Sequence, residues 1–202
     1  MKLWHGWLCA MSLLPASALA DGIDYGSIDA FYVPHATINA QWPESRNVDS
    51  GGDGFGVRVM SRITNTLTFM GEYAHGSYDA GLDTNQFRIG VGLTTPSTSG
   101  VFLSYERLAL DVDNADGFAV HARVAGELMA PVSLYGDAAY GGWNASRFYY
   151  DGFEFTLGAT VDLPKLWGLF ADYRVLRLDD GTRPEHVQEQ FIRVGVRYRF
   201  DC

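Results

Sequence analysis

Alternation of apolar and polar residues recurs along this chain and constrains its fold more than any other feature. Over residues 192–200 every second residue is apolar or aromatic, and Arg193, Gly195, Arg197 and Arg199 lie between them. This is the period of a β-strand with one apolar and one charged face. Similar segments start at residues 53, 85, 116, 151 and 189, each with a turn-type or acidic residue, then Gly or Gln, then Phe. The repeat predicts an all-β fold built from one recurring unit.

A second set of alternating segments precedes the first, so the predicted unit is a β-hairpin. These segments cover residues 27–40, 66–79, 100–113, 133–146 and 167–180. Five hairpins predict ten strands in an antiparallel up-and-down transmembrane β-barrel, with eight strands as the alternative. Polar connections such as 41–52 are longer, and connections such as 64–66 are short. Outer-membrane barrels have long outer loops and short periplasmic turns, which predicts periplasmic termini.

Residues 1–20 differ from the rest of the chain. One Lys is followed by an apolar stretch and by Ala18, Leu19 and Ala20. This pattern is typical of a cleaved signal peptide, so we expect a barrel domain over 21–202 that starts at Asp21. The barrel domain then keeps one cysteine, Cys202, and has no intrachain disulfide. It contains no apolar run of about 18 residues that would predict a membrane helix.

The two faces of the predicted strands differ in charge. If the phenylalanines at 55, 87, 118, 153 and 200 face lipid, the opposite faces carry eight acids and eight bases. Buried charges are costly unless they are paired, so equal numbers predict a narrow lumen filled with ion pairs. A soluble β-sandwich or lipocalin-like barrel is the alternative, but it has no reason to collect such a balanced set. The expected lumen residues are Asp29, Arg58, Arg62, Glu72, Arg88, Glu106, Arg123, Glu127, Asp137, Glu154, Asp162, Asp172, Arg174, Arg193, Arg197 and Arg199.

The face assignment is interrupted in two strands. After Tyr105 and Tyr173 the leucines alternate in the opposite phase. A β-bulge in each strand would explain this change, and it leaves Arg107 and Arg177 without an assigned face. His35 and His121 are expected on inward faces. Phe191 also falls inward, out of step with the other repeats.

The last strand carries a pattern of its own. Arg193, Gly195, Tyr198 and Phe200 resemble the C-terminal targeting strand of bacterial outer-membrane barrels, and the chain as a whole resembles the small OmpA/OmpX-like barrel family. The resemblance implies insertion by the barrel assembly machinery and names no activity. The chain departs from the family because it is predicted to have ten strands rather than eight. It also continues past the final aromatic residue to Cys202.

Chemistry is sparsely represented in the sequence. His75 and Ser77 are similar to the pair in lipid A deacylases, but the following Asn of those enzymes is Tyr78 here, and no third group is evident to orient a base. Residues 111–117 depart from a calcium loop, since Ala115 occupies a ligand position. We therefore expect no cofactor, no metal and no enzymatic activity.

The composition narrows the function further. The 15 basic against 24 acidic residues argue against nucleic-acid binding. We expect a monomer in the cell outer membrane, in contact with outer-membrane lipids and lipopolysaccharide, with a structural or surface-interaction role. A small porin-like channel is the alternative, and a barrel enzyme acting on outer-membrane lipid is the second alternative.

Overall fold

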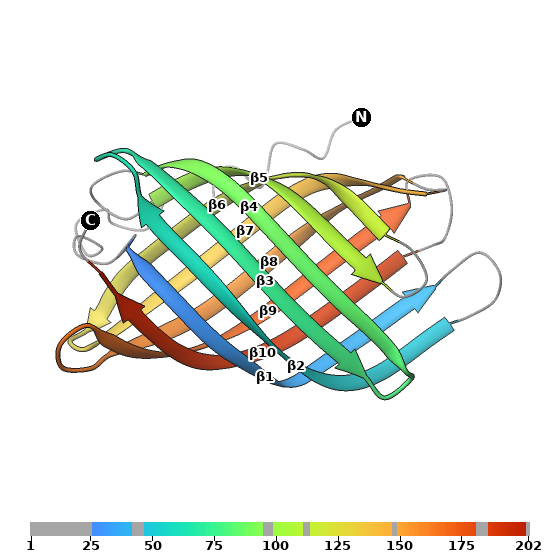
Figure 1. The fold of residues 1–202 in the computed structure, drawn as a ribbon, viewed down its shortest axis with the longest axis horizontal. Helices are drawn as coiled ribbons and strands as arrows, with labels where there is room; N and C mark the ends of the chain where they lie inside the picture. Colours follow the sequence, from blue (N-terminus) through green and yellow to red (C-terminus); the bar gives the residue numbers. More distant parts are fainter. Residues whose placement is uncertain are drawn as a thin grey trace, which may run out of the picture.

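A computed structural model describes residues 26–41, 47–94, 99–110, 114–146, 149–180 and 186–200. The predicted signal peptide and Asp21 lie outside these residues. Within them, no helix is long and apolar enough to cross a membrane. Ten strands make up the fold (Figure 1): β1 Ser27–Gln41, β2 Asn47–Arg62, β3 Leu67–Tyr78, β4 Leu82–Thr94, β5 Ser99–Leu110, β6 Asn114–Met129, β7 Val132–Ala145, β8 Tyr149–Asp162, β9 Trp167–Asp180 and β10 His186–Arg199.

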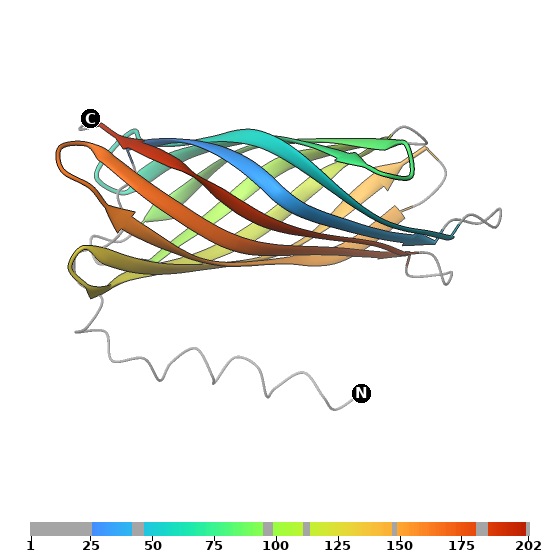
Figure 2. The same cartoon turned by 90° about the horizontal axis from the view of Figure 1, so that it is seen from below.

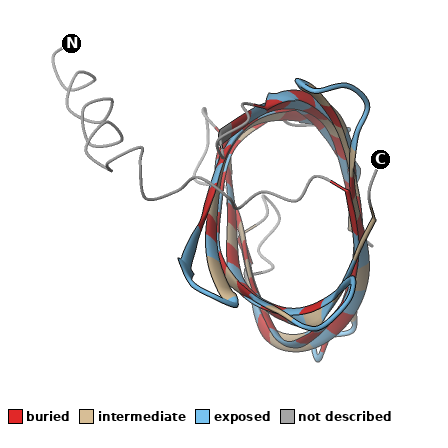
Figure 3. Ribbon diagram, turned by 90° about the vertical axis from the view of Figure 1, so that its left-hand side faces the viewer, coloured by how far each residue is buried: buried red, intermediate tan, exposed pale blue. Residues whose placement is uncertain are grey.

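The strands close into one antiparallel barrel. Each strand pairs with the next along the chain, and β1 pairs with β10. Ser27 lies opposite Arg199, so the start of β1 and the end of β10 share one end of the barrel (Figures 1 and 2). Viewed along its axis the barrel is a flattened ring (Figure 3), which brings opposite walls close together. The prediction of ten strands is confirmed, and the eight-stranded alternative is excluded.

The connections do not differ in length as the sequence suggested. At the end that holds the termini they comprise residues 63–66, 95–98, 130–131 and 163–166; at the other end they comprise 42–46, 79–81, 111–113, 146–148 and 181–185. The expected long loops are short because the strands continue through the polar segments, as β2 does from Asn47. The predicted asymmetry in loop length is therefore wrong, since strand extensions replace the long loops.

The outer wall carries an apolar belt with a ring of aromatic residues at its far edge. In four hairpins a Tyr on one strand lies opposite a Phe on the next, as Tyr32 does with Phe55. The hydroxyl of that Tyr donates to an acceptor two residues before the Phe in three cases, for example to Asp53 at 2.9 Å. Apolar side chains, many of them more than 40% exposed, cover the wall between this ring and the termini. Such a belt, closed by an aromatic girdle, is the surface of a membrane-spanning barrel. The girdle comprises Tyr32, Phe55, Tyr73, Phe87, Tyr105, Phe118, Tyr140, Phe153 and Tyr173.

Beyond the girdle, apolar side chains face the lumen and charged side chains face outward, the reverse of the arrangement within the belt. Leu108 on β5 and Leu178 on β9 are buried in the lumen, whereas Arg107 and Arg177 face outward. The pairing of both strands is regular through this region. The predicted bulges are therefore wrong: the strands stay straight, and the wall changes from apolar outside to polar outside where it leaves the membrane.

A real bulge occurs in β1. The register of β1 shifts between Val33 and Ala36 on the β2 side, where Pro34 cannot donate to the ladder. Both Pro34 and His35 are exposed. The predicted inward position of His35 is therefore wrong, because the bulge turns it to the outside. His121 and Phe191 are buried in the lumen as expected.

Candidate functional site

The lumen holds a row of charges that alternates in sign over six neighbouring strands. From β10 through β1 to β5, each of these residues lies directly opposite the next in the pairing register. Side chains directly opposite one another in a sheet lie close enough to pair. Local strand pairing therefore creates this row of contacts without any loop or helix. The row reads Arg197, Asp29, Arg58, Glu72, Arg88 and Glu106.

Ion pairs also cross the lumen between strands that are not neighbours. Glu154 on β8 accepts a hydrogen bond across the lumen from Arg88 on β4 at 2.5 Å, in addition to one from Arg174 on the neighbouring strand β9 at 2.6 Å. Glu72 on β3 accepts from Arg174 at 3.0 Å and from Arg193 on β10 at 3.2 Å. Each of these side chains is less than 10% exposed. The flattened barrel allows these contacts, which connect its opposite walls.

Toward the termini, two aspartates hold the arginines of β2 and β10. Asp29 accepts from Arg58 at 2.7 Å and from Arg197 through Nε and Nη2 at 2.7 and 2.9 Å. Asp172 accepts from Arg193 through the same pair of nitrogens at 2.5 and 3.1 Å. Two-nitrogen pairing of this kind fixes the plane of the guanidinium. Both aspartates are therefore fully used as structural partners.

His121 extends the network to β6. Its Nε2 lies 2.8 Å from Glu106, and its Nδ1 lies 3.1 Å from Asp137. Two carboxylates can both be satisfied only by an imidazolium, which has two N–H donors. These paired residues define the charge layer of the lumen: Asp29, Arg58, Glu72, Arg88, Glu106, His121, Asp137, Glu154, Asp172, Arg174, Arg193 and Arg197.

Five of the expected lumen residues lie elsewhere or pair differently. Arg62 and Glu127 are exposed near the ends of β2 and β6. Arg199 is half-buried at the end of β10 and pairs with Asp162 at 2.6 Å. Arg123 is buried, yet its Nη1 donates to the sulfur of Met60 and its guanidinium lies over the ring of Tyr135, and it forms no ion pair with a carboxylate of the described residues.

Above the charge layer, the lumen is apolar. Buried side chains from eight of the ten strands form one cluster, and most of them lie toward the end opposite the termini. This apolar layer was not predicted from the sequence, because the expected bulges would turn the leucines of β5 and β9 to the outer wall. The layer comprises Val33, Ile38, Tyr78, Leu108, Trp143, Tyr150, Leu176, Leu178, Val187 and Phe191.

Glu189 is a buried carboxylate inside the apolar layer that the sequence analysis missed. It is 1% exposed and accepts hydrogen bonds from Tyr78, Thr84 and Gln86. Its position opposite Ile38 on β1 places it on the inward face. Its period-two relation to Arg193 would have revealed it, because the predicted segment already starts at residue 189.

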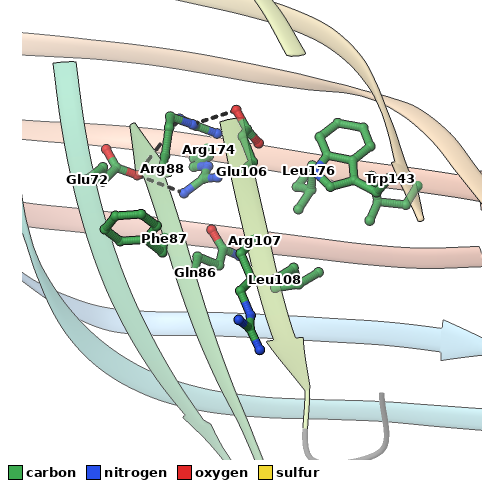
Figure 4. Close-up of a pocket in the computed structure, with 11 residues that line it drawn as sticks. Glu72, Gln86, Phe87, Arg88, Glu106, Arg107, Leu108, Trp143, Arg174 and Leu176 are labelled. Atoms are coloured by element: carbon green, nitrogen blue, oxygen red, sulfur yellow. Dashed lines mark hydrogen bonds and ion pairs between the residues drawn. The ribbon is translucent and has the colours of Figure 1, made fainter. Parts of the chain in front are cut away.

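Two small cavities remain between the packed side chains. One lies where the charge layer meets the apolar layer, and Figure 4 shows Glu72, Arg88, Glu106 and Arg174 there with Trp143 and Leu176 beside them. The space open to water centres is ≈ 20 Å³ in this cavity and ≈ 30 Å³ in the second, which lies beside Arg123. Such volumes hold a few waters each.

One group in the lumen has the residue types of a metal site. Ligand atoms of His121, Asp137 and Glu154 lie within 4.8 Å of one another. Asp137 already faces His121, and Glu154 accepts from Arg88 and Arg174. A divalent cation would have to displace these partners in a strongly basic surrounding. The geometry therefore favours ion pairs over a metal centre.

His75 and Ser77 both lie on the outer wall, beyond the girdle. Nδ1 of His75 lies 3.1 Å from Oδ1 of Asn85, and that oxygen also accepts from Tyr73 at 2.8 Å. The imidazole packs against the ring of Phe55 at 5.2 Å. His75 is therefore held by an amide and by aromatic rings, without a carboxylate to orient it as a base.

The residues of the expected assembly pattern have structural contacts of their own. Tyr198 faces outward and packs edge-on against Trp167 at 5.1 Å. A Cβ on Gly195 would lie 2.3 Å from the carbonyl oxygen of Ala30 and 2.7 Å from the ring of Phe170. Only glycine fits there. Phe200 lies just after β10, half-buried, and its N–H donates to Gly26 at 2.8 Å.

Solved structures with a similar fold include several membrane barrels. Neisserial surface protein A is 17% identical, with 86% of this chain and 96% of that chain covered and a TM-score of 0.49. An outer-membrane channel of Pseudomonas putida F1 is 9% identical, with 94% and 100% covered and a TM-score of 0.49. The KdgM porin is 12% identical, with 87% and 99% covered and a TM-score of 0.40. At these identities the likeness concerns the fold alone. No protein-family model and no curated protein sequence matches the chain.

Proposed function

We propose that this chain is an outer-membrane barrel with a closed lumen and a structural or surface-interaction role. The observation that carries the proposal is the filling of the lumen by two successive layers. The charge layer crosses the membrane-embedded part, with ion pairs between opposite walls such as Arg88 with Glu154. The apolar layer lies above it, and its Ile38 and Leu178 are each 1% exposed. Water and ions would have to pass both layers.

The outer wall supports an orientation with both termini in the periplasm. The polar extension beyond the girdle carries outward-facing charged and amide groups, while the belt reaches almost to the ends of the strands at the terminal side. In outer-membrane barrels the longer polar segments lie on the outer side. We therefore place both termini in the periplasm and the polar extension outside.

The same extension supports a contact with lipopolysaccharide. Asp53, Asp83 and Asp116 face outward beyond the girdle and are exposed, and Asp151 is half-buried there. Divalent cations could bridge these carboxylates to anionic head groups. This contact would anchor the barrel at a fixed depth and would need no catalytic residue.

Single-channel recording in planar bilayers tests the closed lumen. Purified, heat-modifiable protein should show at most small, irregular conductance, because both layers exclude a continuous water path. A large and stable conductance in the unmodified protein would contradict the proposal and would favour the porin-like alternative. An open porin recorded in the same bilayer provides the positive control.

A further inference from the structure

We infer that the lumen contains a binding site for a small monovalent anion of the halide class, centred on Arg123. The inference begins with the unusual surroundings of this side chain. Arg123 is 8% exposed. Of the buried lumen arginines that the structure describes, it alone forms no ion pair with a carboxylate. Its Nε–H is buried without a hydrogen-bond partner, and its Nη1 approaches only the sulfur of Met60, at 3.4 Å.

The aromatic ring beside Arg123 does not replace a counterion. The guanidinium carbon of Arg123 lies 4.8 Å from the centre of the Tyr135 ring, and that of Arg58 lies 5.8 Å from the same centre. Burying a guanidinium has a desolvation cost, which an ion pair with a carboxylate can offset. A cation–π contact is too weak to offset this cost alone. Two guanidiniums on one ring also concentrate positive charge at this point.

The carboxylates around the same cavity are already engaged. Asp137 lies opposite Arg123 in the register, but it faces His121 at 3.1 Å. Glu72 and Glu154 each accept from two arginines. With His121 as an imidazolium, the charge layer holds six acids and six bases, so the positive charge of Arg123 has no counterpart within it. A bound anion would satisfy the free Nε–H and balance this charge.

The size of the cavity limits what can bind. Arg123, Arg58, Tyr135 and Thr156 line the cavity together with the engaged carboxylates of Glu72, Asp137 and Glu154, and Met60 and Phe102 add apolar surface. Its ≈ 30 Å³ of space for water centres suits a halide and excludes an organic anion such as gluconate. Met60 and Met70 lie on the terminal side of the cavity. Methionine side chains rearrange readily, which provides a route of entry.

Bromide is the direct probe of this site. Crystals of the detergent-solubilised protein soaked in bromide should show an anomalous peak within hydrogen-bond distance of the Arg123 guanidinium. In solution, chloride-35 NMR should show excess line broadening with the protein, relative to an equal concentration of empty micelles. Sodium gluconate at matched ionic strength should not compete with chloride, whereas bromide should.

The matched variants are Arg123→Met and Arg107→Met. Both remove one positive charge, but Arg107 lies exposed on the outer wall. We expect the bromide-competed broadening to be lost in Arg123→Met and unchanged in Arg107→Met. Equal broadening in the two variants, or bromide peaks only on surface residues, would overturn the site. If Arg123→Met does not assemble, the bromide map of the unmodified protein still decides the question.

Discussion

A single carboxylate, that of Glu154, holds two arginines that come from different parts of the wall. Arg88 donates to it from β4 across the lumen, and Arg174 donates from the neighbouring strand β9. All three side chains are less than 10% exposed. A neutral amide at this position would keep the volume but leave two buried cations short of one negative charge.

Glu154→Gln should therefore destabilise the folded barrel by about 3–5 kcal/mol, the usual cost of breaking a buried ion pair by removing one partner. Glu127→Gln makes the same chemical change at an exposed position and should shift stability by no more than about 0.5 kcal/mol. Reversible urea unfolding in lipid vesicles, followed by tryptophan fluorescence, measures both. Similar losses in the two variants would show that Glu154 contributes no more than surface charge.

The sequence identifies most residues of the charge layer but only some of their partners. Arg58 with Asp29 and Arg88 with Glu106 follow from alternation, because neighbouring strands bring these residues opposite one another. The pair of Arg88 with Glu154 depends on how far the ring is flattened. That is a property of the closed barrel, which no local pattern encodes. Arg123 was expected to form an ion pair for the same local reason. Asp137, the acid directly opposite it, faces His121 instead.

At the scale of strands, β5 and β9 show that a change of hydrophobic phase need not mean a change of backbone. The sequence suggested a bulge after Tyr105 and Tyr173, because the outer face of each strand was assumed to contact lipid over its whole length. The strands instead pass from lipid into water at the girdle. Below it, a charged lumen faces a lipid-exposed apolar wall, and above it an apolar lumen faces a polar wall. The alternation is continuous, and only the surroundings of the wall differ.

Cysteine labelling distinguishes the straight strand from a bulged one. In a Cys202→Ser background, Arg177→Cys should react fully with a bulky, membrane-impermeant maleimide, because Arg177 is exposed. Leu178→Cys should react only after denaturation, because Leu178 is 1% exposed in the apolar layer. Labelling is read as a mass shift of the assembled barrel. The reverse pattern would restore the bulge.

The final strand combines a proposed assembly role with clear structural contacts. Tyr198 packs on Trp167, and Phe200 follows the last ladder residue with its N–H bonded to Gly26. The repeat and the alternation predicted this strand correctly. Its role in assembly stays a proposal, because packing alone would also explain why Gly195 and Tyr198 occupy their positions.

Phe200→Asp should reduce the amount of heat-modifiable barrel in the outer-membrane fraction without changing synthesis, because it places a charge at the membrane interface where the last strand ends. Tyr149→Asp makes a similar change at the opposite end of the barrel, where Tyr149 is exposed, and should assemble normally. Gel mobility before and after heating gives the assembled fraction.

To separate targeting from stability, both proteins are also refolded from urea into vesicles. Equal refolding with unequal assembly in cells supports a signal, whereas a refolding defect in Phe200→Asp would assign its effect to packing.

At the scale of the whole molecule, the lumen has two barriers of different chemistry in series. The charge layer excludes water by direct pairing between walls. The apolar layer excludes ions because its side chains are packed without a water path and its buried carboxylate, Glu189, is already held by Tyr78, Thr84 and Gln86. Charge removal acts on the first barrier and leaves the second in place. Arg88 belongs to the charge layer, and Trp143 and Leu178 belong to the apolar layer above it.

Three variants test whether both barriers matter. Arg88→Ala combined with Arg123→Ala should raise the conductance little, because the apolar layer stays closed above the stranded acids. Trp143→Ala combined with Leu178→Ala should also conduct little, since the ion pairs remain. All four changes together should give a stable conductance that prefers cations, because Glu72, Glu106 and Glu154 would then line an open path without two of their buried basic neighbours. Each variant is recorded in planar bilayers after its heat-modifiable mobility has been checked, and reversal potentials in a salt gradient give the selectivity. If the double arginine variant alone conducts stably, the apolar layer is no barrier, and closure depends on the ion pairs.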